Sequence, residues 1–193
     1  MIPSYIQDLS LEIALAQYCQ HVDSCILTSH QNEHIVDLED NKVSVFVTPT
    51  IGQVEDSAKK FFEVHNPINK DFSLLQIDHG VINTSKTKKC DCAVIDDLDC
   101  AFVEFKTNAV SVNTDTIKRN YNKALRQLSI TIDIFRSGLI SIGKDLDKLR
   151  NMEAYVCFKK GYPRRTASEG TYRVKFAETN RCALYFDSKK ELK

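Results

Sequence analysis

Apolar and polar residues follow two different periods along this chain, and each period predicts its own kind of element. Apolar residues recur every three or four positions over residues 117–135, which predicts one long helix capped by Asn113 and ended by Gly138. All other predicted elements are shorter: helices over residues 10–21 and 50–64, and strands over residues 34–38, 43–47, 72–77, 89–95, 100–106, 153–158, 172–177 and 182–186.

The strands over residues 89–95 and 100–106 flank a short acidic turn, which predicts a β-hairpin. Side chains alternate between the faces of a strand, so Glu104 and Lys106 point the same way and Asp91 meets them from the paired strand. Two carboxylates and an ammonium are costly to bury without a partner. A divalent metal ion is such a partner, and metal-assisted hydrolysis is the usual reason for the cluster.

An ordinary solvated hairpin with a polar outer face is the competing interpretation. Against it, Cys100 and Phe102 share a face with Glu104, while Ala101 and Val103 occupy the other face. Both faces are therefore largely apolar, which predicts a strand covered on both sides.

The spacing of Asp91, twelve intervening residues and then Glu104-x-Lys106 resembles the motif of the PD-(D/E)XK nuclease superfamily. Cys90 stands where that family often has proline. The resemblance implies a restriction-endonuclease-like fold in which Asp91 and Glu104 hold Mg²⁺ or Mn²⁺. It implies that Lys106 orients or activates the attacking water.

The predicted elements agree with that fold. From about residue 50 they run helix, strand, strand, strand, helix, strand, which is the αβββαβ core of a mixed α/β domain. We therefore expect one nuclease-like domain over residues 1–193. Its core would span residues 50–160, with a helix and hairpin decoration over residues 1–48 and a C-terminal β-hairpin over residues 161–193.

Three further residues enter through the resemblance. The first core helix of the family often adds a Glu to the metal site, so Glu55 is the candidate there and Glu63 the second choice. Some branches of the family place a Gln near the site on the long helix, which points to Gln127. An exposed helix residue remains the alternative interpretation for each.

Positive charge is unevenly distributed in a chain whose formal net charge is zero. Lys and Arg outnumber Asp and Glu over residues 148–193, and the reverse holds over residues 78–105. An acidic site beside a basic surface suits a metal-dependent enzyme that meets a polyanion. The candidate nucleic-acid contacts are Lys123, Gln127, Lys159, Lys160, Arg164 and Arg165, with ordinary solvated charge as the alternative.

Seven cysteines, an odd number, and the absence of an export signal predict reduced thiols and a cytoplasmic protein. No apolar run is long enough for a membrane span. Cys90, Cys92 and Cys100 have poor spacing for zinc, so small core residues are the better interpretation.

The sequence thus predicts a Mg²⁺-dependent nuclease for which DNA is a better candidate substrate than RNA. A protein partner and a second copy of the chain are the candidate binding partners. Small nucleases of bacterial anti-phage systems are an analogy at the level of fold. The alternative is a binding or regulatory subunit that keeps the nuclease fold without turnover. A third alternative, an α/β protein unrelated to nucleases, would place Asp91 away from Glu104.

Overall fold

The computed structural model describes residues 2–19, 21–38, 43–47, 61–107, 109, 111–159, 162 and 168–193. Its elements follow in chain order: α1 (Ser4–Gln7), α2 (Leu11–Ala14), the 3-10 helix η1 (Val22–Cys25), β1 (Ile26–Ser29), β2 (Glu33–Leu38), β3 (Val43–Val47), β4 (Phe61–His65), β5 (Phe72–Gln76), β6 (Cys92–Ile95), β7 (Asp99–Lys106), α4 (Thr114–Ser141), α5 (Leu146–Leu149), β8 (Asn151–Phe158), α6 (Ser168–Asn180), β9 (Ala183–Tyr185) and β10 (Lys189–Glu191).

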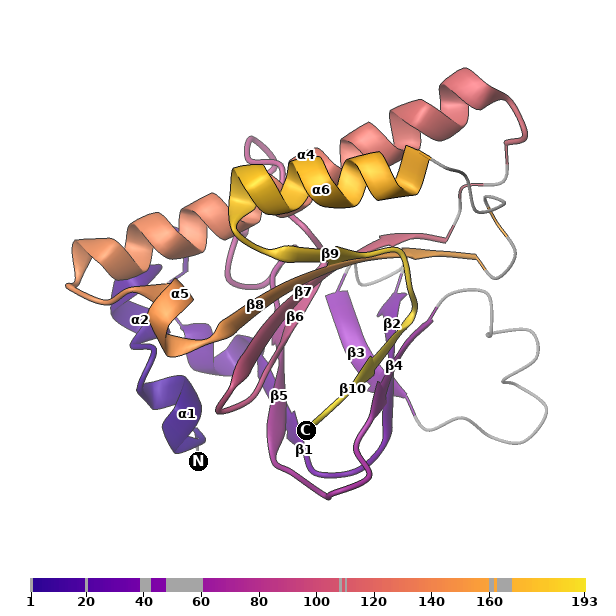
Figure 1. The fold of residues 1–193 in the computed structure, drawn as a ribbon. Coiled ribbons are helices and arrows are strands. Elements are labelled where there is room, and N and C mark those ends of the chain that lie inside the picture. The colour runs from indigo at the N-terminus through magenta and orange to yellow at the C-terminus, as the bar shows by residue number, and fades with distance from the viewer. Residues whose placement is uncertain are drawn as a thin grey trace.

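The larger sheet has six strands in the order β1-β5-β6-β7-β8-β9 (Figure 1). Strands β5, β6 and β7 pair antiparallel, and β8 returns parallel to β7 after α4. The mixed α/β class and the expected run of three strands, a helix and a strand are confirmed. The expected helix over residues 50–64 is wrong at its end, because Phe61–His65 alternate in burial and form β4. The rest of that helix lies outside the described residues.

The smaller sheet has four strands in the order β10-β4-β2-β3. The expected hairpin of β2 and β3 is confirmed, with Ile35 opposite Phe46 in antiparallel register. This part of the chain is not an appendage, however. Strand β1 pairs with β5 in the larger sheet and β2 pairs with β4 in the smaller one, so residues 26–38 contribute to both sheets. The expected helix over residues 10–21 shortens to the single turn of α2.

Both faces of β7 are covered, as its apolar sequence predicts. On one face, the ring of Phe102 packs edge-to-face on Phe135 of α4 with centroids 5.1 Å apart. On the other face, Val103 joins Phe62 and Ile35 in a second core between the two sheets. Full burial of each such side chain contributes about 1.5–3 kcal/mol to folding. The strand that carries Glu104 and Lys106 is thereby fixed between two apolar layers.

Helix α4 begins as predicted, because the side chain of Asn113 accepts hydrogen bonds from the backbone nitrogens of Asp115 and Thr116. It does not end at Gly138. A Cβ atom on Gly138 would lie 2.4 Å from the backbone oxygen of Ala14, so this glycine lets α2 approach α4 closely. The residue that terminates the helix is Gly143, with a left-handed φ of 76°.

The expected C-terminal hairpin is wrong. Residues 172–177 lie inside helix α6, and β9 pairs parallel with β8 rather than with a neighbouring hairpin strand. Tyr172, Val174 and Phe176 alternate with polar residues like a strand, but of these only Phe176 is buried, beside Asn180 one helical turn later. The last strand, β10, leaves the larger sheet altogether and pairs with β4 (Figure 1).

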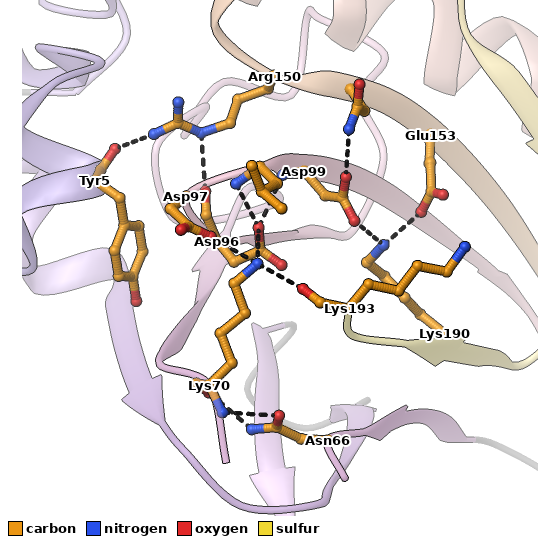
Figure 2. Close-up of polar contacts among 12 residues, drawn as sticks. Tyr5, Asn66, Lys70, Asp96, Asp97, Asp99, Arg150, Glu153, Lys190 and Lys193 are labelled. Carbon is orange, nitrogen blue, oxygen red and sulfur yellow. Dashed lines mark hydrogen bonds and ion pairs between the residues drawn. The ribbon is translucent and has the colours of Figure 1, made fainter. Parts of the chain in front are cut away.

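A buried ion-pair cluster ties β10 to the larger sheet (Figure 2). Nζ of Lys190 donates to Oδ2 of Asp99 at 2.8 Å and to Oε2 of Glu153 at 2.7 Å. The Lys190 side chain is 2% exposed, and its bonds to the two carboxylates offset the cost of removing its charge from water. The cluster joins the two sheets at the end of β7 opposite Glu104 and Lys106.

The acidic turn between β6 and β7 has the expected Asx geometry. Oδ1 of Asp96 accepts from the backbone nitrogens of Leu98 at 2.7 Å and Asp99 at 2.8 Å. Arg150 fixes this turn to the N-terminal segment, with Nε bound to the oxygen of Asp96 and Nη2 bound to the oxygen of Tyr5 (Figure 2). Within the described ranges, no helix combines the length and apolarity that a bilayer span requires.

Candidate active site

The hairpin brings Asp91, which directly precedes β6, beside the part of β7 that carries Glu104. The last pair of the antiparallel ladder is Cys92 opposite Val103. The backbone nitrogen of Asp91 donates to the oxygen of Val103 at 3.1 Å. Its side-chain Oδ2 accepts from the backbone nitrogen of Phe105 at 2.5 Å. The first expected carboxylate is thus held against the strand that carries the second.

Glu104 and Lys106 interact directly. Two positions apart on β7, they share the face that α4 covers, and Nζ of Lys106 donates to Oε1 of Glu104. The Glu104 side chain is 1% exposed and the Lys106 side chain 13% exposed. The ion pair is therefore largely buried and does not lie on an open strand surface.

Gln127 of α4 completes this group. Its Oε1 accepts from Lys106 at 3.2 Å, and its Nε2 donates to Oε2 of Glu104 at 3.1 Å and to the backbone oxygen of Lys89 at 2.8 Å. Gln127 is expected from the sequence both near the site and among the nucleic-acid contacts; in the structure it is bonded to both expected catalytic side chains of β7. Its place on the helix face that carries Leu128 and Thr131 is the sequence signal for this position.

A second hydrogen-bonded link fastens α4 to the segment before β6. Oγ1 of Thr131 accepts from the backbone nitrogen of Cys90 at 2.8 Å and donates to the oxygen of Gln127 at 2.9 Å. Together with the bond from Gln127 to Lys89, these contacts hold the residues that lead into Asp91. The helix therefore positions both carboxylate-bearing strands at once.

Burial is the largest influence on the charges of the site. It raises the pKa of Asp91 to about 7, with a further rise from the charge of Asp37, while the bond from Phe105 and the charge of Lys106 act in the opposite direction. Burial also raises the pKa of Glu104. The charge of Asp91 raises this pKa further, and the charge of Lys106 acts in the opposite direction. Two neighbouring carboxyl groups that both resist ionisation favour a cation between them.

Two more carboxylates contribute to the field at Asp91. Asp37 reaches it from β2 of the smaller sheet, and Asp78 follows β5. Asp78 is itself paired, with Oδ1 at 3.1 Å from Nζ of Lys89 and 3.4 Å from Nε2 of His79. Among the described residues, no group of three His, Cys, Asp or Glu side chains lies close enough together to hold a metal ion.

The remaining expected site residues are distributed differently. Lys123 is exposed on α4, one turn before Gln127, and its charge lowers the pKa of Glu104. Lys159 directly follows β8 and is partly buried. Glu63 lies on β4 and pairs with Lys189 at 3.0 Å, so it is not a residue of the first helix. Glu55, Lys160, Arg164 and Arg165 lie outside the described residues.

The cysteines form no disulfide. All seven are free. Cys90 lies in the core beneath α4 and Cys92 in the core between the sheets, so their thiols face opposite ways. Burial raises the pKa of each of these two thiols well above the usual value, which keeps them protonated. The expectation that they are small core residues fits this arrangement.

A comparison of this chain with protein-family models, with curated proteins and with solved structures finds no match.

Proposed function

We propose that this protein is a Mg²⁺- or Mn²⁺-dependent nuclease that hydrolyses phosphodiester bonds, with DNA as the first substrate to test. One observation carries the proposal. Glu104 and Lys106 are hydrogen-bonded to each other and to Gln127, and the residue between them, Phe105, donates its backbone N–H to Asp91. Asp91, Glu104 and Lys106 are the residues that the PD-(D/E)XK resemblance marks as the catalytic set.

The donor set at this group suits a hard divalent cation. Asp91 and Glu104 offer carboxylate oxygens, and the backbone oxygen of Phe105 lies on the strand between Glu104 and Lys106. Oxygen donors of this kind are the ligands that Mg²⁺ prefers, with water completing its coordination. The raised pKa of Asp91 is a further point in favour, because a cation would offset the cost of ionising this buried carboxyl. When bound, the metal would polarise a phosphoryl oxygen and acidify a water molecule.

The protein's own side chains supply orientation. In the structure, Lys106 is held between Oε1 of Glu104 and Oε1 of Gln127, so its ammonium is confined to the edge of the two-carboxylate group. From there it would orient the attacking water and offset negative charge that develops on the phosphate. Gln127 would keep Glu104 and Lys106 in register through its bonds to both.

A nuclease-fold subunit that binds nucleic acid without cleaving it is the second candidate. It differs from the first in one respect: the carboxylates would hold no metal and Lys106 would serve only to pair them. Metal-dependent cleavage therefore separates the two directly.

The test is cleavage of supercoiled plasmid in Mg²⁺ or Mn²⁺ by the wild type and by Asp91→Asn, a change that keeps an acceptor for the nitrogen of Phe105. Asp133→Asn, on the exposed side of α4, is the matched control. We expect metal-dependent nicking that falls at least about 100-fold in Asp91→Asn and stays unchanged in Asp133→Asn. Nicking at the wild-type rate by Asp91→Asn would remove the proposal, and binding without cleavage by the wild type would favour the second candidate.

A further inference from the structure

A group of aromatic rings lies beside the candidate active site and outside its hydrogen-bonded group. It consists of Tyr121, Phe158, Tyr162, Tyr172 and Phe186 and is called the aromatic cluster below. The rings come from α4, from the end of β8 and the segment after it, from α6 and from the segment after β9. Nothing in the proposed chemistry uses them.

The aromatic cluster begins next to Lys106. Lys106 is the last residue of β7 and lies in register with Phe158, the last residue of β8, in adjacent parallel strands. Such partners are about 4.8 Å apart in the hydrogen-bonding direction. Phe158 then packs against Tyr121 of α4, with ring centroids 4.9 Å apart, and against Tyr162 at 6.1 Å. The rings therefore extend from the position of the catalytic lysine outward.

Tyr172 and Phe186 form the outer part of the aromatic cluster. The ring of Tyr172 stacks on Tyr121 with centroids 5.2 Å apart and an interplanar angle of 12°. Phe186 lies edge-on to Tyr121 at 5.0 Å and 6.4 Å from Tyr172. Tyr121 is buried, but Phe158, Tyr162, Tyr172 and Phe186 each remain partly exposed.

One cation lies over one of these partly exposed rings, and a second follows another ring in the sequence. The guanidinium carbon of Arg173 lies 5.8 Å from the centroid of the Phe186 ring, and Lys159 directly follows Phe158. The carboxylate of Glu169 accepts a hydrogen bond from the hydroxyl of Tyr121 at 2.9 Å. Aromatic faces for bases beside cations for phosphates are the combination that binds a single strand.

We propose that the aromatic cluster binds the unpaired bases of single-stranded nucleic acid and leads the strand to Lys106. This inference rests on the proposed function for the direction in which the strand runs, but the binding itself does not. In a duplex, each base is stacked on its neighbours and its faces are closed to a protein side chain. Rings set beside the catalytic group can therefore meet bases only in a single strand or an unpaired end.

The first experiment measures binding with no metal present, so that cleavage plays no part. Fluorescein-labelled DNA and RNA strands of about 12 nucleotides, and the duplex of the DNA strand, are titrated in EDTA and followed by anisotropy. We expect one or both single strands to bind at least about tenfold more tightly than the duplex. Equal affinity for strand and duplex, or equal displacement of the strand by polyglutamate, would overturn the inference.

Variants of Tyr172 then locate the binding. Tyr172→Leu should weaken binding of the single strand by about five- to tenfold or more, whereas Tyr172→Phe keeps the ring and should bind like the wild type. Val174→Ala, at an exposed position of the same helix, is the control. Circular dichroism confirms that each variant is folded, and Phe186→Leu replaces Tyr172→Leu if that variant is not. Unchanged binding by the folded variant would overturn the inference.

The two proposals fail separately. Ring-dependent binding of a single strand by a protein that cleaves nothing would keep the aromatic cluster as a nucleic-acid site and remove the nuclease. Cleavage of plasmid with no effect of Tyr172→Leu on binding would keep the nuclease and remove the aromatic cluster from its substrate path.

Discussion

Gln127 on α4 donates a hydrogen bond of 3.1 Å to Oε2 of Glu104 on β7, while Lys106 occupies Oε1 of the same carboxylate. Both oxygens of a nearly inaccessible glutamate are thus satisfied, one from the helix and one from its own strand. The position of α4 over the sheet therefore decides how Glu104 is oriented. The same amide also accepts from Lys106, so one side chain of the helix holds two residues of the proposed catalytic set.

This relationship predicts that Gln127 is needed for activity more than for folding. Gln127→Leu keeps the volume but leaves Glu104 and the oxygen of Lys89 without their donor. We expect cleavage to slow by about 10–100-fold and unfolding to become easier by about 1–3 kcal/mol. Initial rates and urea denaturation measure the two effects. Asp133→Ala on the exposed side of the helix is the control, and wild-type cleavage by Gln127→Leu would refute the role.

The raised pKa of Asp91 predicts how the stability of the metal-free protein depends on pH. Because the folded state keeps this carboxyl protonated up to about pH 7, whereas the unfolded chain releases the proton near 3.8, the folded state binds more protons between these values. The free energy of unfolding should therefore fall as pH rises from about 4 to about 7, by roughly 4 kcal/mol from Asp91.

Asp91→Asn isolates this contribution, since it removes the titrating group and retains a hydrogen-bond acceptor. Urea denaturation in EDTA at several pH values should show a shallower decline for the variant, and a higher stability than the wild type at about pH 8. Added Mg²⁺ should stabilise the wild type at that pH and leave the variant unchanged. Identical pH profiles for the two proteins would mean that Asp91 ionises normally.

Two glycines in helices are predicted to respond oppositely to the same change. Gly138→Ala should destabilise the protein by about 1–3 kcal/mol, because the new Cβ meets the backbone oxygen of Ala14 at 2.4 Å. Gly170→Ala on α6 meets nothing within 4 Å and should stabilise by up to about 1 kcal/mol through helix propensity. Thermal unfolding of both variants tests the close approach of α2 to α4; a stabilising Gly138→Ala would rule it out.

The ion-pair cluster that ties β10 to the larger sheet predicts that two adjacent lysines contribute differently to stability. Lys190→Met leaves the partly buried carboxylates of Asp99 and Glu153 without their shared cation, and we expect a loss of about 3 kcal/mol. Lys189→Met removes an exposed pair with Glu63 and should cost less than about 1 kcal/mol. Urea midpoints of the two variants make the comparison. Equal midpoints would show that the buried cluster does not join the sheets in solution.

Local signals in the sequence identify the parts of the fold that local rules determine. Two apolar runs around an acidic turn predict the hairpin of β6 and β7, and the cap at Asn113 with its apolar stripe predicts α4. Alternation fails over residues 172–177, which lie in a helix that buries Phe176 and Asn180 one turn apart. Gly138 misleads in the same way, because it serves a distant contact with α2 instead of a helix end.

The candidate site also combines contacts that local sequence predicts with contacts that depend on tertiary packing. The motif spacing predicts that Asp91 lies beside the strand of Glu104 and Lys106, and the hairpin with the hydrogen bond from Phe105 to Asp91 places it there. The bonds of Gln127 depend on how α4 lies across the sheet, and no local pattern contains that information. No local pattern predicts the influence of Asp37 either, whose charge acts on Asp91 from the other sheet.

The central claim is that Asp91 and Glu104 hold the metal and that Lys106 acts on the reaction. Lys106→Met tests it most directly, with Mn²⁺ binding measured by calorimetry and plasmid cleavage measured on the same preparation, alongside Asp91→Asn. The account predicts that Lys106→Met binds Mn²⁺ as well as the wild type and cleaves at least about 100-fold more slowly, whereas Asp91→Asn loses both. Cleavage at the wild-type rate by Lys106→Met, or undiminished Mn²⁺ binding by Asp91→Asn, would contradict it.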